Sequence, residues 1–252
     1  MFDLRLIGAE ALKLRKRHGM VALAIALTAG VAVLVFTVTA VQHASNAGKY
    51  GPAGGLAHYR DAVGFLILMI LVVGAIVGST AGAADLESGV FRDLAATGRS
   101  RIALFGSRIP GAWTIVLPIA AGAAAIAAAA SVALAGSLAA PSAGAIIAGT
   151  FALLLAGALG SALAVGLAAL FGSRGPVIAT LLAFELAISP ILASLSFLGG
   201  VRQVLPGESL DRIGQVSLHA VPIALPIAML VIAAWTAVAF SVGAWRTKTQ
   251  EI

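Results

Sequence analysis

One carboxylate lies inside a long apolar stretch, where a charge is poorly solvated. Glu185 stands in the sequence LLAFELAISPI. An ionisable side chain in such a segment points by default to a functional site. Glu185 could be protonated, paired with an arginine, or hydrogen-bonded to the hydroxyl of Thr180 or Ser189. From the sequence, a structural pair and a contact to a substrate both remain open.

A second group of charges interrupts the apolar sequence at residues 85–101, DLESGVFRDLAATGRSR. Glu87 or Ser88 is placed to cap a short helix over 89–97, which Gly98 would end. One side of this helix would carry Val90, Phe91, Leu94 and Ala95, with Arg92, Asp93 and Ala96 elsewhere. A two-turn helix is unstable alone in water, so we expect it to pack on its own membrane helices or on a cytoplasmic protein. A solvated connector is the alternative.

The N-terminal sequence FDLRLIGAEALKLRKR, residues 2–17, has the period of an amphipathic helix. Leu4, Ile7, Ala11 and Leu14 share one face, and Arg5, Lys13 and Lys16 lie opposite. Such a helix is suited to the inner headgroup layer of a membrane, although it could be a topological anchor only. Glu10 is the exception among these cations, and its nearest helical partner is Lys13.

The sequence does not contain the residues or motifs that several kinds of site require. There is no cysteine, and His43, His58 and His219 do not have the spacing of metal ligands, so we expect no metal site. No H-E-x-x-H, G-x-S-x-G or phosphate-binding G-x-x-x-x-G-K-[ST] motif occurs. We therefore expect no enzyme activity and no cofactor on this chain, and any ATP must bind to another one. The charge of +6 lacks a basic, aromatic patch, which argues against nucleic-acid binding.

The elements that must position these residues are membrane helices. Of the 252 residues, 60% are hydrophobic and only 10% are charged, whereas about a quarter are charged in a soluble domain. Six apolar segments are long enough to cross a bilayer as helices. At this length, only a helix satisfies every backbone hydrogen-bonding group of the segment within lipid. We therefore predict an all-α polytopic membrane protein, with spans near Met20–Val41, Ala62–Ala84, Ile109–Leu138, Gly144–Phe171, Val177–Leu198 and Val221–Ala244.

The distribution of basic residues predicts the orientation. With the N-terminus inside, 12 of the 16 lysines and arginines fall on the inner side, which supports an N-in, C-in topology. The chain then divides into a cytoplasmic amphipathic helix, residues 1–19, and a six-helix transmembrane domain, residues 20–252. That domain has an inner loop at 85–108 and a polar outer loop at 199–220.

Two further patterns concern packing and chain direction. Gly74, Gly78 and Gly82 recur every four residues on one face of the second span, which predicts a close helix contact. Pro222 and Pro226 favour either a broken, re-entrant start of the last span or a plain helix start at Pro222.

Together these patterns resemble the permease subunit of type-2 ATP-binding-cassette exporters. The residues that carry the resemblance are Glu87, Gly89, Leu94, Ser100, Arg101 and Arg108 in the inner loop, and Glu10, Lys13, Arg15 and Arg17 at the N-terminus. The resemblance implies two paired permease subunits in a cell membrane, either identical or sister chains, each bound to a cytoplasmic ATPase that holds ATP and Mg²⁺. The heavy use of alanine and glycine favours a bacterial source. It also implies that the ATPase docks on the inner loop and the N-terminal helix, through Glu10, Lys13, Glu87, Gly89, Val90, Phe91, Arg92, Asp93, Leu94, Arg99 and Arg101.

The resemblance further places a substrate path between the two subunits, along the second and fifth spans. Glu185, with Thr180 and Ser189, would lie on that path. Because Glu185 is the only buried charge we expect, the substrate would be apolar or amphipathic, such as a drug, an antibiotic or a lipid. The main alternative is a secondary transporter or channel that uses Glu185 as a proton or cation site. An intramembrane enzyme or assembly factor is a third class, for which no catalytic residues are found.

Overall fold

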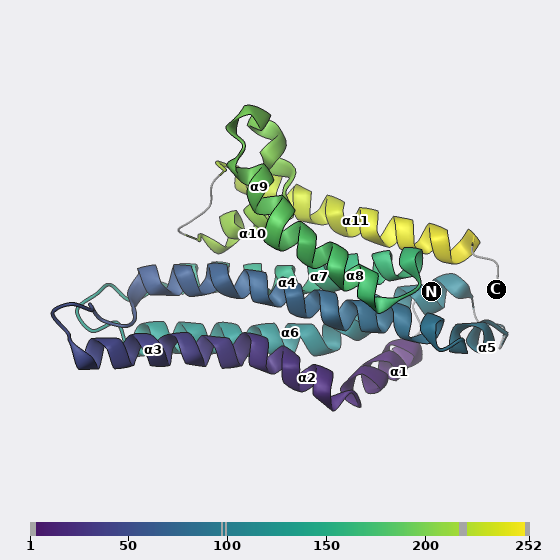
Figure 1. The fold of residues 1–252 in the computed structure, drawn as a ribbon, viewed down its shortest axis with the longest axis horizontal. Helices are drawn as coiled ribbons and strands as arrows, with labels where there is room; N and C mark the ends of the chain where they lie inside the picture. The colour runs from purple at the N-terminus through teal and green to yellow at the C-terminus, as the bar shows by residue number, and fades with distance from the viewer. Residues whose placement is uncertain (1–3, 97, 99, 217–220, 250–252) are drawn as a thin grey trace.

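The computed structural model describes residues 4–96, 98, 100–216 and 221–249, and its regular structure in these ranges is helical, with loops between the helices and no strand. Figure 1 shows long helices running side by side, with a shorter group inclined away from them. The helices are α1 (Leu4–Arg15), α2 (His18–Ile25), α3 (Val31–Ser45), α4 (Gly55–Glu87), α5 (Val90–Ala96), α6 (Arg101–Ala133), α7 (Ala143–Phe171), α8 (Arg174–Ala183), α9 (Ser189–Ser194), α10 (Pro206–Gly214) and α11 (Leu225–Thr249).

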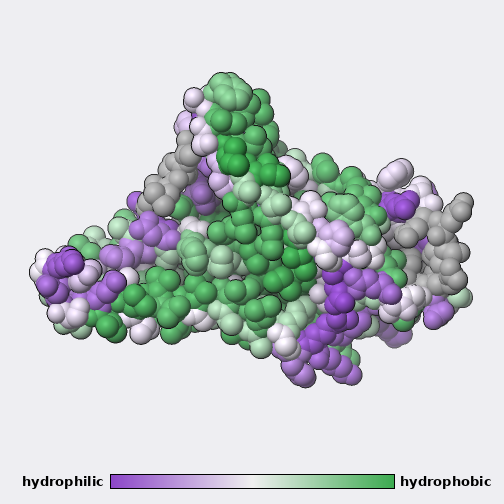
Figure 2. Space-filling model, in the orientation of Figure 1, coloured by the Kyte–Doolittle hydropathy of each residue, from purple (hydrophilic) through white to green (hydrophobic). Residues whose placement is uncertain are grey.

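Six continuous helical segments are long and apolar enough to cross a membrane. They are His18–Ser45, Gly55–Glu87, Arg101–Ala133, Ala143–Phe171, Arg174–Ser194 and Leu225–Thr249. Figure 2 shows hydrophobic residues over the middle of the molecule and hydrophilic residues gathered toward its two ends. Such a surface is compatible with a multi-pass membrane protein, because large continuous apolar patches mark contact with lipid or with another protein.

Two of the six segments contain a π-helical turn, at Ala26–Gly30 and at Phe184–Ile188. The first joins α2 to α3, and the second joins α8 to α9. Such turns often occur at functional sites because the extra residue changes the direction of the side chains that follow. The second turn contains Glu185, whose side chain is buried.

The centre of the fold is the contact between α4 and α7, the two helices with the most buried residues. Gly74, Gly78 and Gly82 lie in this contact. A Cβ at Gly74 would be 2.8 Å from the amide nitrogen of Ser161, and one at Gly82 would be 2.5 Å from the Cβ of Ala168. The absence of side chains thus lets the two backbones approach closely, as small-residue spacing does in membrane helices.

Several helices extend beyond the apolar segments in the sequence. The helix α4 includes the polar residues from His58 to Asp61 and continues to Glu87, and α6 starts at Arg101 and passes through Pro110 and Pro118 without a break. Polar residues with good helix propensity extend these helices beyond their apolar segments, so hydropathy alone does not locate the helix ends. The prediction of a helix start at Pro222 is wrong, because residues 221–224 are non-helical and α11 begins at Leu225.

The connection between α9 and α11 folds back onto the bundle. It contains a 3₁₀ segment, Ser196–Val204, followed by α10. A Cβ at Gly214 would lie 3.2 Å from Ala152 of α7 and 3.3 Å from Val63 of α4, and Val63 is well inside α4. Trp235 of α11 donates a hydrogen bond to the carbonyl of Val204, at 2.9 Å. The connection therefore lies along the sides of the long helices.

Candidate functional site

The N-terminal helix α1 packs against α6 where α6 carries a glycine. A Cβ at Gly111 would be 2.6 Å from the Cβ of Glu10, so only glycine permits this approach. Leu14, one turn further along α1, is completely buried. Leu4, by contrast, is 80% exposed, so α1 contacts the bundle through its C-terminal half.

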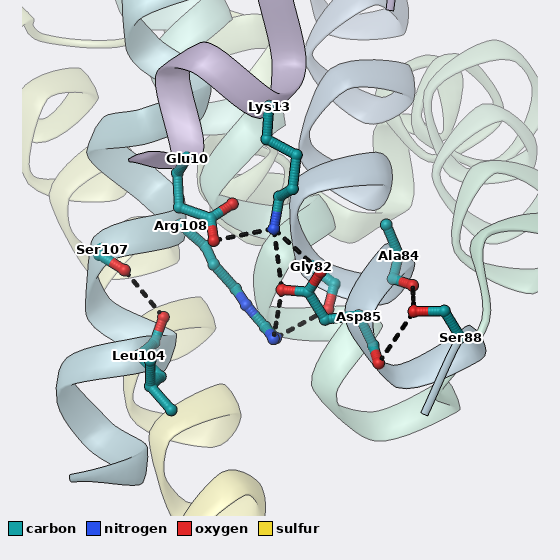
Figure 3. A network of polar contacts seen from close by, with 9 residues as sticks. All are labelled: Glu10, Lys13, Gly82, Ala84, Asp85, Ser88, Leu104, Ser107 and Arg108. Carbon is teal, nitrogen blue, oxygen red and sulfur yellow. Dashed lines mark hydrogen bonds and ion pairs between the residues drawn. The ribbon is translucent and has the colours of Figure 1, made fainter. Parts of the chain in front are cut away.

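Four charged residues from three helices meet beside this contact, and we call them the polar network: Glu10, Lys13, Asp85 and Arg108. Figure 3 shows their side chains converging from α1, α4 and α6. The Lys13 ammonium lies 2.9 Å from Glu10 Oε1 and 2.8 Å from Asp85 Oδ2. The Arg108 guanidinium donates a hydrogen bond to the carbonyl of Gly82, at 2.8 Å, and lies 3.6 Å from Asp85 Oδ2.

The two most buried members of the polar network depend on each other. The side chain of Arg108 is 2% exposed and that of Asp85 is 9% exposed, so the expectation that Glu185 is the only buried charge is wrong. A buried charge is strongly unfavourable unless an opposite charge and hydrogen bonds replace its water. Lys13, whose side chain is 32% exposed, adds a second cation to Asp85 and so ties α1 to the pair. The network thus joins three elements at the end of the bundle that carries α5.

The sequence placed Lys13 opposite the apolar face of the N-terminal helix, and the structure adds a partner from another helix. Lys13 points into the protein, where it contacts Glu10 and Asp85. The amphipathic period of α1 led us to expect a helix lying on a flat membrane surface, whereas α1 lies against α6 and α4. The Glu10–Lys13 pair itself forms as its spacing predicts, although Glu10 Oε2 is buried without a hydrogen-bond partner.

The short helix in the charged segment spans Val90–Ala96, within the predicted 89–97. Gly89 precedes it with φ +75°, in the left-handed region where glycine is favoured. The Ser88 hydroxyl donates a hydrogen bond to the Ala84 carbonyl at the end of α4. Val90 is 42% exposed, Asp93 is exposed and Leu94 is half-buried.

Three predicted docking residues of this region lie partly or wholly outside the described part of the structure. Phe91 and Arg92 lie in the helix α5, but their side chains fall outside the described part of the structure, and so does the whole of Arg99. Arg101 is the first residue of α6, which Ser100 caps by accepting a hydrogen bond from the amide of Ala103.

Glu87 makes a contact that the sequence did not reveal. Its carboxylate accepts hydrogen bonds from the backbone amide and the guanidinium Nε of Arg174, both at 2.7 Å. Arg174 opens α8, so this exposed pair links the end of α4 to the turn between α7 and α8. The position that the resemblance gives to ATPase docking is therefore also an internal contact of the chain.

Glu185 lies at a junction between the fifth segment and α10. Its side chain is buried, and Oε1 has no hydrogen-bond partner. The position of a Cβ at Gly207 would be 3.8 Å from Glu185 Oε2 and 3.7 Å from the Ser189 hydroxyl, so both side chains face the start of α10. Thr180 is exposed and lines a separate apolar groove with Phe184 and Trp235. The structure thus groups Glu185 with Ser189 but not with Thr180.

Asp85 is the site residue that sequence reasoning missed. It was visible as a charge at the edge of an apolar segment, but its partners are 72 residues before it and 23 residues after it. Spacing along one helix reveals partners only three or four residues away. Among the residues that the structure describes, no group of three or more potential metal ligands occurs.

Taken together, these contacts can hold helices in fixed relative positions, but they form no catalytic group with a nucleophile and a base. The polar network and the Glu87–Arg174 pair both lie at the α5 end, and Glu185 lies between the fifth segment and α10. No protein-family model matches the chain, and no curated protein matches it at a significant level.

Proposed function

We propose that the chain is the transmembrane permease subunit of an ATP-driven exporter of the type-2 ATP-binding-cassette class. It would work as a pair of permeases in the cell membrane, each bound to a separate ATPase that carries ATP and Mg²⁺. Its cargo would be apolar or amphipathic. The six apolar helices and the resemblance of the 85–108 loop support this proposal.

The observation that carries the proposal is the polar network, which joins α1, α4 and α6 at the end of the bundle where α4 leads into α5. An ATPase that contacts α1 would push on a helix that Lys13 ties to Asp85 of α4, and Asp85 in turn pairs with Arg108 of α6. Because buried ion pairs resist separation, the three elements would move as one body. ATP binding on the partner would thereby bias the helices between two arrangements.

The test is coupling to an ATPase. The chain is co-expressed with each ATP-binding-cassette ATPase of the source genome, beginning with any encoded by a neighbouring gene, and ATP hydrolysis is measured on the purified membrane complex. We expect one ATPase to be stimulated by the chain. Val90→Asp, which puts a charge on the exposed apolar face of α5, should abolish the stimulation.

The matched control introduces the same carboxylate at the other end of the bundle. Gly51 is exposed, and a Cβ there would meet nothing within 4 Å, so Gly51→Asp should leave the stimulation unchanged. If no ATPase is stimulated, or if Val90→Asp and Gly51→Asp behave alike, the chain is not driven through α5.

The unpartnered Oε1 of Glu185 favours one other function, a secondary transporter that uses this carboxylate as a proton or cation site. In that case transport into vesicles would continue after ATP is removed, and would stop with an uncoupler or with Glu185→Gln. Transport that requires ATP and tolerates an uncoupler would eliminate this second candidate.

A further inference from the structure

The corner where α1 meets α2 lies at the edge of the molecule. Figure 1 shows α2 inclined away from the long helices and α1 turning back toward them. The chain changes direction between Arg15, the last residue of α1, and His18, the first residue of α2. Residues 15–18, with the sequence RKRH, form this basic corner, and all four are basic. Figure 2 shows a hydrophilic patch at the same place, next to apolar surface.

The cations of the basic corner are not used inside the protein. Arg15, Lys16 and His18 are exposed, and Arg17 is partly buried. Within the described ranges, the side chains of Arg15 and Lys16 make no hydrogen bond and no ion pair. A surface cation can simply be solvated by water, so its exposure alone identifies no partner. The partner has to be inferred from what surrounds the corner.

The nearest carboxylates already have cations of their own. Asp85 is held by Lys13 and Arg108, and Glu87 is held by Arg174. These carboxylates therefore do not cancel the positive charge of the basic corner. The corner can attract an anion from outside the chain.

The basic corner stands directly before the first membrane segment, His18–Ser45. Leu23 and Ile25, in the second turn of α2, are each 47% exposed and would face hydrocarbon. With a rise of about 1.5 Å per residue, they lie only about 10 Å along the helix from the corner. Because the headgroup layer borders the hydrocarbon, the corner lies at the depth of the lipid phosphates.

The exposed side of α1 places an apolar side chain next to these cations. Leu12 is 55% exposed and lies one turn before Arg15 and Lys16, on the same side of the helix. A lipid presents phosphate and hydrocarbon side by side, which a free phosphate or an acidic protein surface does not. A zwitterionic lipid carries its own cation beside the phosphate, so a lipid with net negative charge is attracted most.

We propose that the basic corner binds an anionic phospholipid, with the phosphate on Arg15 and Lys16 and the acyl chains beside Leu12 and Leu23. Charge complementarity and the depth of the corner select this occupant. The proposal concerns a contact with the membrane itself. It requires no ATPase and does not depend on the proposed function.

The test measures which lipid gathers at the basic corner. The chain has no cysteine, so Ala22→Cys introduces a unique thiol for a fluorophore at an exposed position of α2. The purified protein is placed in phosphatidylcholine nanodiscs with a small fraction of phosphatidylglycerol or phosphatidylcholine, spin-labelled on an acyl chain near the headgroup. From the quenching, we expect phosphatidylglycerol to associate about fivefold more strongly than phosphatidylcholine. This factor corresponds to about 1 kcal/mol, the typical attraction of one lysine or arginine to an anionic membrane surface.

A second fluorophore position gives the background. Ile147 is 68% exposed near the start of another membrane segment, Ala143–Phe171, which has no basic residue near its start in the sequence. With the fluorophore on Ile147→Cys, we expect the two spin-labelled lipids to quench equally. A preference of the same size at both positions would mean that phosphatidylglycerol gathers around the whole protein, and would overturn the proposal.

Variants separate the basic corner from the net charge of the protein. Arg15→Gln combined with Lys16→Gln removes two exposed cations and should bring the lipid ratio at Ala22→Cys to about one. The matched control, Arg246→Gln combined with Lys248→Gln, removes the same charge from the last turn of α11 and should keep the fivefold ratio. Arg15→Lys retains the charge and should also keep the ratio.

Three further results would overturn the proposal. The first is equal quenching by the two lipids at the corner of the unmodified protein, and the second is a preference that survives the loss of Arg15 and Lys16. In the third, inorganic phosphate removes the preference more strongly than sodium chloride of the same ionic strength, which would mean that the corner binds a free anion.

Discussion

At the residue scale, the buried pair of Asp85 and Arg108 is the most sensitive part of the polar network. Asp85→Ala would leave Arg108 buried without its carboxylate, at a cost of about 3–5 kcal/mol in the free energy of unfolding. Lys13→Ala should cost only about 1 kcal/mol, since water reaches the Lys13 side chain. Unfolding of the two variants in detergent micelles measures this difference. Equal losses would mean that Lys13, not Arg108, is the essential partner.

Substitution of Glu185 should raise the free energy of unfolding, whereas substitution of Asp85 or Lys13 should lower it. Because Oε1 has no partner, Glu185→Leu removes an unsatisfied buried group, and we expect the free energy of unfolding to rise by about 1 kcal/mol or more. The same substitution should abolish transport if the carboxylate contacts the cargo. Thermal unfolding and vesicle transport are measured on the same preparation. A lower melting temperature would show that Glu185 is a structural partner after all.

At the element scale, the close contact of α4 with α7 predicts a sharp contrast between two glycines. A Cβ at Gly78 would meet the backbone carbonyl of Ser161, so Gly78→Ala forces the two helices apart. Overpacking of this kind costs about 1–3 kcal/mol. Gly122 of α6 has nothing within 4 Å of its Cβ position, so Gly122→Ala should stabilise by up to ~1 kcal/mol through helix propensity. Unfolding measurements that give the same sign for both would contradict the tight contact.

At the scale of the whole molecule, the bundle has two polar ends, and the excess of basic residues predicts that the α5 end faces the cytoplasm. The chain has no cysteine, so an introduced one is unique. We expect a membrane-impermeant maleimide to label Gly51→Cys in intact cells, and to label Ala96→Cys only after permeabilisation. Both positions are exposed. The reverse labelling pattern would invert the topology and remove α5 from the reach of a cytoplasmic ATPase.

The sequence by itself determined the helical class, the six apolar segments, the short helix after Gly89 and the close-packing face at Gly74, Gly78 and Gly82. Each of these follows from hydropathy, turn residues or spacing within one segment, which are local properties. Only the tertiary structure decided that Lys13 and Arg108 share Asp85, that Glu87 pairs with Arg174, and that α10 lies beside Glu185. The physical reason is that these contacts join residues far apart in the chain, and the geometry of helix packing, which no single segment encodes, brings them together.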